Sequence, residues 1–300
     1  MNRRDFLKIT ATASGALMTG EALASGGKAH VDDSKALGVL VDTTTCIGCR
    51  KCEWACNQAN KLPSQDIKAF DDKSVFNGHR RPTDGAYTVV NTYPDPEIPD
   101  RQRYLKVQCM HCNDPACVSA CIVGAFKKTE LGPVTYDAWK CMGCRYCMLA
   151  CPFQVPAYEY SNALTPRVVK CSFCLERITR ENKVPACVEI CPNEALTFGT
   201  RKGILELAHA RIIQFPGRYN EHIYGEHEVG GTSWLYLAGE DFSVTELPKL
   251  DERPIPEYTE SIQHGVFKSF VPPIALYGLL ALAMHSFKNK GSNGGNHERS

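Results

Sequence analysis

Cysteine is the residue type in this sequence that is best suited to chemistry. The chain has 300 residues and 16 cysteines, and the cysteines fall into four groups of four. The groups are Cys46, Cys49, Cys52 and Cys56; Cys109, Cys112, Cys117 and Cys121; Cys141, Cys144, Cys147 and Cys151; and Cys171, Cys174, Cys187 and Cys191. Thiols used in such numbers form disulfides or bind metal, and their spacing bears on the choice.

The spacing favours iron–sulfur clusters. The first and third groups read C-x2-C-x2-C-x3-C, which is the spacing of bacterial ferredoxins that bind two 4Fe–4S clusters. Zinc sites usually combine two C-x2-C pairs that lie far apart, whereas these groups hold four thiols in 11 residues. A disulfide-stapled module is the other alternative. A 300-residue chain with 43% hydrophobic residues does not need staples for its stability, and random staples would not repeat C-x2-C four times.

The ferredoxin pattern also predicts how the groups share clusters, because the fourth cysteine of one group binds the cluster of the other. Groups two and three begin 32 residues apart, close to the internal repeat of a two-cluster ferredoxin, so groups one and four must pair around them. The predicted ligand sets are Cys46, Cys49, Cys52 and Cys191; Cys56, Cys171, Cys174 and Cys187; Cys109, Cys112, Cys117 and Cys151; and Cys121, Cys141, Cys144 and Cys147. Four clusters held entirely by thiolates leave no iron open to a substrate, so no catalytic residue is predicted.

Other residues near the ligands have simpler interpretations. His111 is interpreted as a loop residue that makes a hydrogen bond, and Trp54 and Trp139 as packing residues. Basic side chains beside the cysteines could offset the negative charge of the clusters, but the sequence singles out none of them. They are Arg50, Lys51, Lys106, Lys127, Lys128, Lys140, Arg145, Lys170 and Arg177.

The elements that must position these cysteines are short. We expect an α+β fold with two nested ferredoxin-like βαββαβ modules, forming a four-cluster domain over residues 36–200 with an insertion at 57–108. Within the insertion only residues 86–90 are predicted to form a strand. A C-terminal extension and linker follows over 201–266, with helical periodicity at 203–213 and an apolar strand at 232–238.

The two ends of the chain predict export and a membrane anchor. Residues 1–24 resemble a twin-arginine signal peptide, with Arg3-Arg4 and the cleavage pattern Ala22-Leu23-Ala24. Residues 270–287 hold no Asp, Glu, Lys or Arg, and a helix of that length spans ~27 Å, so we expect a transmembrane helix over 267–288 and a polar tail over 289–300. These predictions place the protein on the periplasmic face of the cytoplasmic membrane, with its C-terminus in the cytoplasm. A net charge of +1 argues against a nucleic-acid partner.

The whole pattern resembles a known family. The four cysteine groups and both chain ends are similar to the iron–sulfur subunits of the dimethyl-sulfoxide-reductase and formate-dehydrogenase group. A narrower likeness, to the HybA-like electron-transfer subunits of periplasmic, membrane-bound nickel–iron hydrogenases, rests on five short segments. These read Gln-Cys-Met-His-Cys at 108–112, Gly-Cys-Arg-Tyr-Cys-Met at 143–148, Tyr-Gly-Glu at 224–226 with Gly-Gly-Thr at 230–232, Leu-Pro-Lys-Leu-Asp at 247–251 and Ile-Gln-His at 262–264.

The resemblance implies a non-catalytic electron-transfer subunit with four 4Fe–4S clusters. Such a subunit would take electrons from the small subunit of a hydrogenase, which is bound to a large subunit, and pass them to an integral membrane subunit that reduces quinone. The C-terminal helix would pack on that membrane subunit as an anchor in the lipid bilayer. The alternative is the same relay in a formate dehydrogenase or another molybdenum or tungsten oxidoreductase, and the remote alternative is a disulfide- or zinc-stapled extracellular binding module.

Overall fold

The computed structural model describes residues 34–96, 98–162, 164–260, 277–282 and 284. The chain divides into two compact units, one of residues 28–257 and one of residues 1–27 with 258–300. All the cysteines and all the strands that the structure describes lie in the first of these units. The predicted signal peptide and polar tail lie outside the described residues.

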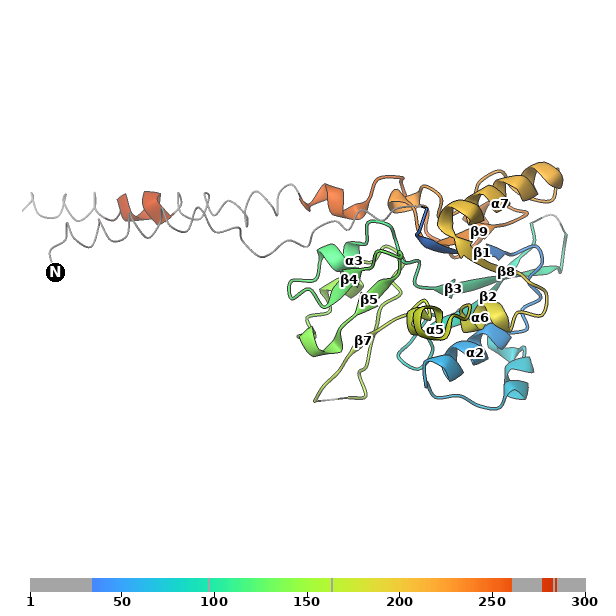
Figure 1. The fold of residues 1–300 in the computed structure, drawn as a ribbon, viewed down its shortest axis with the longest axis horizontal. Coiled ribbons are helices and arrows are strands. Elements are labelled where there is room, and N and C mark those ends of the chain that lie inside the picture. Colours follow the sequence, from blue (N-terminus) through green and yellow to red (C-terminus); the bar gives the residue numbers. More distant parts are fainter. Residues whose placement is uncertain (1–33, 97, 163, 261–276, 283, 285–300) are drawn as a thin grey trace, which may run out of the picture. The chain divides into compact units, whose positions relative to one another are not determined.

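Short elements make up the cysteine-bearing unit (Figure 1). Its strands are β1 (Leu37–Asp42), β2 (Thr88–Pro94), β3 (Gln102–Gln108), β4 (Phe126–Lys128), β5 (Val134–Tyr136), β6 (Ala157–Tyr158), β7 (Val168–Val169), β8 (Leu196–Thr200) and β9 (Trp234–Leu237). Its α-helices are α2 (Lys51–Ala59), α3 (Ala116–Ser119), α4 (Tyr146–Ala150), α5 (Leu175–Glu181), α6 (Ala186–Glu189) and α7 (Arg201–Gln214). The 3-10 helices are η1 (Ile67–Asp71), η2 (Ser74–Asn77), η3 (Ala138–Lys140), η4 (Glu228–Gly230), η5 (Phe242–Val244) and η6 (Ile255–Tyr258).

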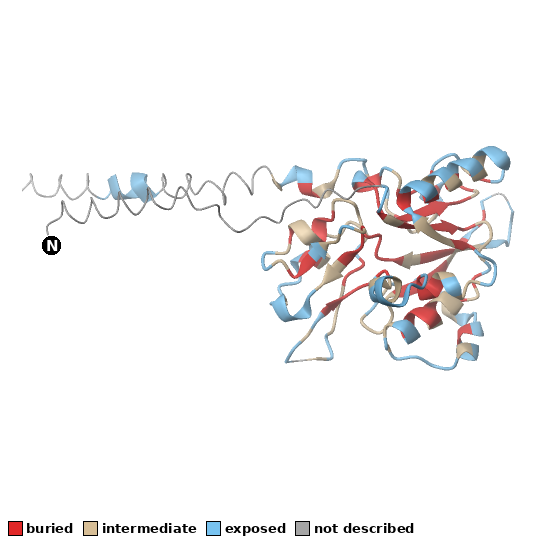
Figure 2. Ribbon diagram, viewed as in Figure 1, coloured by how far each residue is buried: buried red, intermediate tan, exposed pale blue. Residues whose placement is uncertain are grey.

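A three-stranded sheet joins the beginning and the end of the cysteine-rich region. Its order is β8–β1–β9, with β1 antiparallel to β8 and parallel to β9. Because side chains alternate along a strand, β1 serves two cores: Val39 and Val41 point into the larger one, and Leu40 packs with Ile204 and Ala208 of α7. The strand is therefore buried on both faces and paired on both edges (Figure 2).

Three two-stranded ladders complete the unit. They pair β2 with β3, β4 with β5 and β6 with β7, all antiparallel. The strand predicted at 86–90 is present as β2, the helix predicted at 203–213 as α7 and the strand predicted at 232–238 as β9, each with slightly different ends. These small sheets and short helices are consistent with a ferredoxin-like iron–sulfur protein.

The predicted transmembrane helix is wrong. Over the ranges that the structure describes, no helix has the length and the apolar character needed to cross a bilayer. The helical residues described within the predicted span are 277–282 and 284, and six residues rise only about 9 Å, against a hydrocarbon core of about 30 Å. The remainder of the predicted span lies outside the described residues. The predicted fold class loses its C-terminal span for this reason, and so does the predicted location with a single membrane crossing.

Candidate functional site

The four C-x2-C loops share one backbone geometry. In each loop the second residue between the cysteines has a positive φ: 63° at Gly48, 50° at His111, 75° at Gly143 and 57° at Phe173. A positive φ is uncommon for residues other than glycine, so His111 and Phe173 carry a strained conformation. Backbone strain of this kind is retained at functional sites. Because the positive φ recurs at the same position of all four loops, the loops are inferred to have the same function.

Backbone amides in these loops point at sulfur. The Phe173 N–H donates to Cys171 Sγ at 3.3 Å, and the Gly143 N–H donates to Cys141 Sγ at 3.4 Å. Such bonds favour a thiolate. The loops are therefore built to carry negative charge on sulfur.

Short helices carry the later cysteines of each group. Cys52 and Cys56 lie four residues apart on α2, and this spacing places both on one side of the helix. Cys117 lies on α3, Cys147 on α4 and Cys187 on α6. In each group the last cysteine is therefore one helical turn from the one before it or follows directly on a helical turn.

The outer two predicted ligand sets each combine cysteines from the beginning and the end of the cysteine-rich region. Burial raises the pKa of Cys46 to about 11, and the thiolates of Cys191 and Cys49 act in the same direction. Burial likewise raises the pKa of Cys56, and the thiolates of Cys171 and Cys187 add to the shift. The structure thus brings Cys191 to the first loop although 145 residues of sequence separate it from Cys46.

Cysteines of the inner two predicted ligand sets interact electrostatically with one another in the same manner. Burial raises the pKa of Cys112 well above its usual range, and the thiolates of Cys151, Cys109 and Cys117 raise it further. For Cys147, burial raises the pKa to about 11, with additional contributions from the thiolates that follow. These are Cys121, Cys141 and Cys144.

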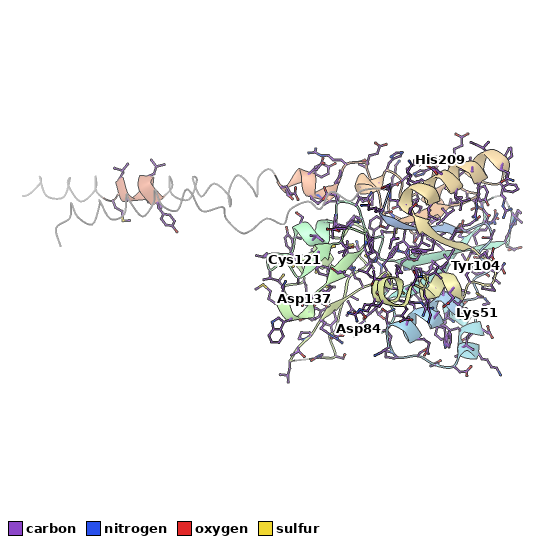
Figure 3. All side chains as sticks on the ribbon, in the orientation of Figure 1. Lys51, Asp84, Tyr104, Cys121, Asp137 and His209 are labelled. Atoms are coloured by element: carbon purple, nitrogen blue, oxygen red, sulfur yellow. The ribbon has the colours of Figure 1, made fainter. Side chains whose placement is uncertain are left out.

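The sets also meet one another in sequence along the unit. The Cys187 thiolate contributes to the raised pKa of Cys52, Cys109 to that of Cys171, and Cys147 to that of Cys117, in each case after burial. Each of these three pairs joins two different predicted sets. Figure 3 labels Lys51 of α2 and Cys121 on opposite sides of the unit.

The cysteines are available as ligands. All sixteen are free, and the four predicted sets contain four thiols each. A cubane cluster binds each of its four thiolates through its own iron.

Two of the three interpreted neighbours can be judged. His111 is fully buried and its Nδ1 accepts a hydrogen bond from the Val134 N–H at 2.9 Å, so the prediction of a hydrogen-bonded loop histidine is confirmed. Trp139 is 93% exposed, so its interpretation as a packing residue is wrong. The sequence offered no signal for this, because exposure depends on the arrangement of the surrounding loops.

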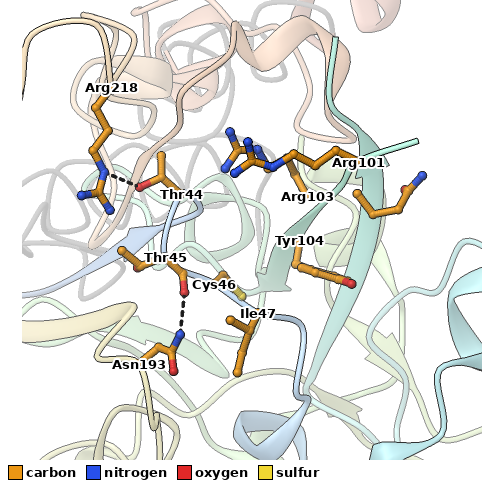
Figure 4. Close-up of a pocket in the computed structure, with 10 residues that line it drawn as sticks. Thr44, Thr45, Cys46, Ile47, Arg101, Arg103, Tyr104, Asn193 and Arg218 are labelled. Carbon is orange, nitrogen blue, oxygen red and sulfur yellow. Dashed lines mark hydrogen bonds between the residues drawn. The ribbon is translucent and has the colours of Figure 1, made fainter. Parts of the chain in front are cut away.

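An open pocket of about 570 Å³ lies beside Cys46 (Figure 4). Its walls carry three arginines, Arg101, Arg103 and Arg218, of which Arg103 is paired with carboxylates of Asp95 and Glu240, both at 2.9 Å. The Arg218 Nε donates to Thr44 Oγ1 at 3.2 Å and fixes the loop that leads into the first cysteine group. The sequence did not identify this pocket, because its residues come from four separate segments.

Comparison with known proteins decides the family. The protein-family model of a 4Fe-4S dicluster domain matches residues 101–201. The hydrogenase-2 operon protein HybA of Escherichia coli O157:H7 is 36% identical over an alignment of 332 positions, which covers all of both chains. The chain belongs to the HybA family of iron–sulfur subunits. It therefore binds multiple 4Fe–4S clusters, and it is an iron–sulfur electron-transfer subunit of an oxidoreductase complex.

Two further relatives widen the comparison. A protein of Nitratidesulfovibrio vulgaris is 48% identical over an alignment of 296 positions, which covers 96% of this chain and 78% of that protein. The iron–sulfur subunit of the nitrate-inducible formate dehydrogenase of Escherichia coli K12 is 32% identical over an alignment of 261 positions, which covers 84% of each chain. The family thus includes subunits named for two different oxidoreductases.

Proposed function

We propose that the chain is a relay of four 4Fe–4S clusters between the small subunit of a nickel–iron hydrogenase and a quinone-reducing subunit. The observation that supports the proposal is that cysteines of separate groups interact electrostatically in the pattern of the four predicted sets. Each set supplies the four thiolates that one cubane needs. The clusters would supply one-electron transfer, and the chain would hold them, exclude water and provide compensating charge.

The electrostatic interactions between cysteines of different predicted sets support a linear relay. They connect the first set to the second through Cys52 and Cys187, the second to the third through Cys171 and Cys109, and the third to the fourth through Cys117 and Cys147. Electrons would then pass each cluster once. At the first end Cys46 borders the open pocket, and at the last end Cys144 is exposed. These two ends are where electrons would enter and leave.

The choice of a hydrogenase rests on the relatives. The match to HybA covers both chains completely, whereas the match to the formate dehydrogenase subunit covers 84% of each. The second candidate is the same relay in a formate dehydrogenase, which that 32% identical subunit favours. The two candidates differ in the catalytic partner and share the ligand sets.

Purification of the native complex through a tag on this chain tests both parts. Four clusters require about 16 irons and about 16 acid-labile sulfides per chain, and about eight of each would refute the four-cluster relay. Co-purified nickel together with hydrogen-dependent dye reduction would support the hydrogenase partner. A molybdopterin subunit with formate-dependent dye reduction and no nickel would overturn that partner and leave the relay intact.

A further inference from the structure

Lys106 differs from the other basic residues near the cysteines in how it is buried. It lies on β3 with 3% of its surface exposed. Its ammonium donates to Gln108 Oε1 at 2.8 Å and lies 4.3 Å from the centre of the Trp234 ring. Among the described residues, no carboxylate lies within 4.0 Å of this ammonium, so it forms no ion pair with one.

Two other lysines near the cysteines, the buried Lys170 and the half-buried Lys128, are held differently. Lys170 Nζ donates to the Val134 carbonyl at 2.6 Å, and Lys128 Nζ donates to the Cys112 carbonyl at 2.7 Å. Each makes a second bond to a backbone carbonyl as well. These two ammonium groups tie loops together, whereas Lys106 has an amide oxygen and an aromatic face as its partners.

A buried ammonium needs negative charge close by, because its desolvation is otherwise unfavourable. The negative groups around Lys106 are thiolates. Burial acts to lower the pKa of Lys106, and four thiolates outweigh this effect and raise it. They are Cys187, Cys52, Cys171 and Cys56. Cys52 belongs to the first predicted ligand set and the other three belong to the second, so the ammonium interacts with both sets. Cys52 and Cys187 also pack against the same hydrophobic core as Trp234, the ring that the ammonium contacts.

A hydrogen-bonded network keeps the ammonium in this place. Gln108, which accepts from Lys106, donates from its Nε2 to Tyr236 Oη at 2.6 Å. Tyr236 Oη in turn donates to the Lys106 carbonyl at 2.8 Å. Both partners are buried, with 1% and 0% of their surfaces exposed. The side chain therefore cannot turn outward and surrender its charge to water.

We propose that the Lys106 ammonium sets the reduction potentials of the first two clusters together, an inference that rests on the proposed function. Each cluster gains one negative charge when it accepts one electron, and the fixed positive charge stabilises that electron at either position. No proton leaves or joins Lys106 in this step. A cation shared by the two clusters therefore raises both potentials in the same direction.

Redox titration of the native complex, followed by electron paramagnetic resonance, tests this role. In Lys106→Met we expect the ratio of reduced to oxidised cluster at a fixed potential to fall about tenfold, which is a shift of 59 mV for a one-electron couple. The shift should be confined to two of the four clusters. Lys106→Arg keeps the charge and should restore the potentials, and Lys127→Met removes an exposed lysine and should change nothing.

Iron and sulfide contents separate the possible outcomes. A Lys106→Met variant with full iron and unchanged potentials overturns the inference, and so does an equal shift of all four clusters. If this variant loses clusters, Gln108→Glu replaces it, because a carboxylate 2.8 Å from the ammonium would cancel the charge without removing the side chain. Unchanged potentials in Gln108→Glu would then refute the role. A wild-type complex without four clusters would refute the proposed function instead.

Discussion

Glu53 joins the insertion at 57–108 to the helix that carries the first cysteines, and its loss should destabilise the whole unit. The carboxylate lies on α2 with 4% of the residue exposed. It accepts hydrogen bonds from Arg80 Nη2 at 2.6 Å, from the Val90 N–H at 2.7 Å and from Arg50 Nη2 at 3.2 Å. Glu53→Gln would keep the shape of the side chain and leave two guanidinium groups without their counter-charge.

The size of the effect follows from these contacts. Removal of one partner from a buried ion pair costs about 3–5 kcal/mol. In a domain of 150–250 residues, each kcal/mol lowers the melting temperature by about 2–4 °C. We therefore expect the melting temperature of the Glu53→Gln protein to fall by roughly 6–20 °C. The assay is thermal unfolding of the purified complex, followed by circular dichroism and by the visible absorbance of the clusters.

A matched control shows whether the charge network or any lost carboxylate is responsible. Glu176 pairs with Arg180 at 3.8 Å, and both side chains are about four-fifths exposed. Exposed pairs contribute only about 0–1 kcal/mol, so Glu176→Gln should melt within ~4 °C of the wild type. If Glu53→Gln melts in the same narrow range, Glu53 does not anchor the insertion and the reasoning fails.

Three further predictions address the loops and one surface pair. Cys191→Ser should remove the cluster that is predicted to bind Cys46, Cys49 and Cys52, with loss of about four irons. The cluster predicted to bind Cys171, Cys174 and Cys187 should remain, and its loss instead would contradict the proposed sharing. Gly48→Ala should abolish the same cluster as Cys191→Ser, because the added Cβ would overlap the ring of Tyr104. Gly124 has a similar φ and no atom within 4 Å of an added Cβ, so Gly124→Ala should keep every cluster. Glu159 has a pKa lowered by its hydrogen bond with Arg167, so its stabilising effect is present at neutral pH and is lost as pH falls through the lowered pKa. Glu159→Gln should therefore reduce the melting temperature at pH 7, and the reduction should become smaller as pH falls below the usual range of glutamate; a reduction that does not change with pH would refute the electrostatic origin.

Local patterns in the sequence were sufficient for the cysteine loops and for several elements. The C-x2-C spacing is a property of a few consecutive residues, and the structure gives all four loops one backbone geometry. The helix α7 and the strand β9 were also predictable, because apolar periodicity is read over about ten residues. These predictions succeeded since each depended on neighbours in the chain.

Contacts between distant segments could not be predicted. Nothing near Val39 indicates that it pairs with Phe198 on one edge and with Trp234 on the other. Lys106 and Lys127 look alike in the sequence, yet one is buried and the other is exposed. The predicted membrane helix failed for a different reason: it was inferred from the absence of charge, which does not by itself provide a helix of sufficient length.

The position of β1 in the middle of its sheet has a consequence during synthesis of the chain on the ribosome. This strand is made early, but its antiparallel partner β8 begins 154 residues after its end, and β9 comes later still. At 5–20 residues per second, both edges of an apolar strand remain without partners for roughly 8–30 s. Exposed edges of this kind invite pairing with other chains. The nascent chain therefore has a period in which a chaperone would protect it, and this period closes only when residues 196–237 have emerged.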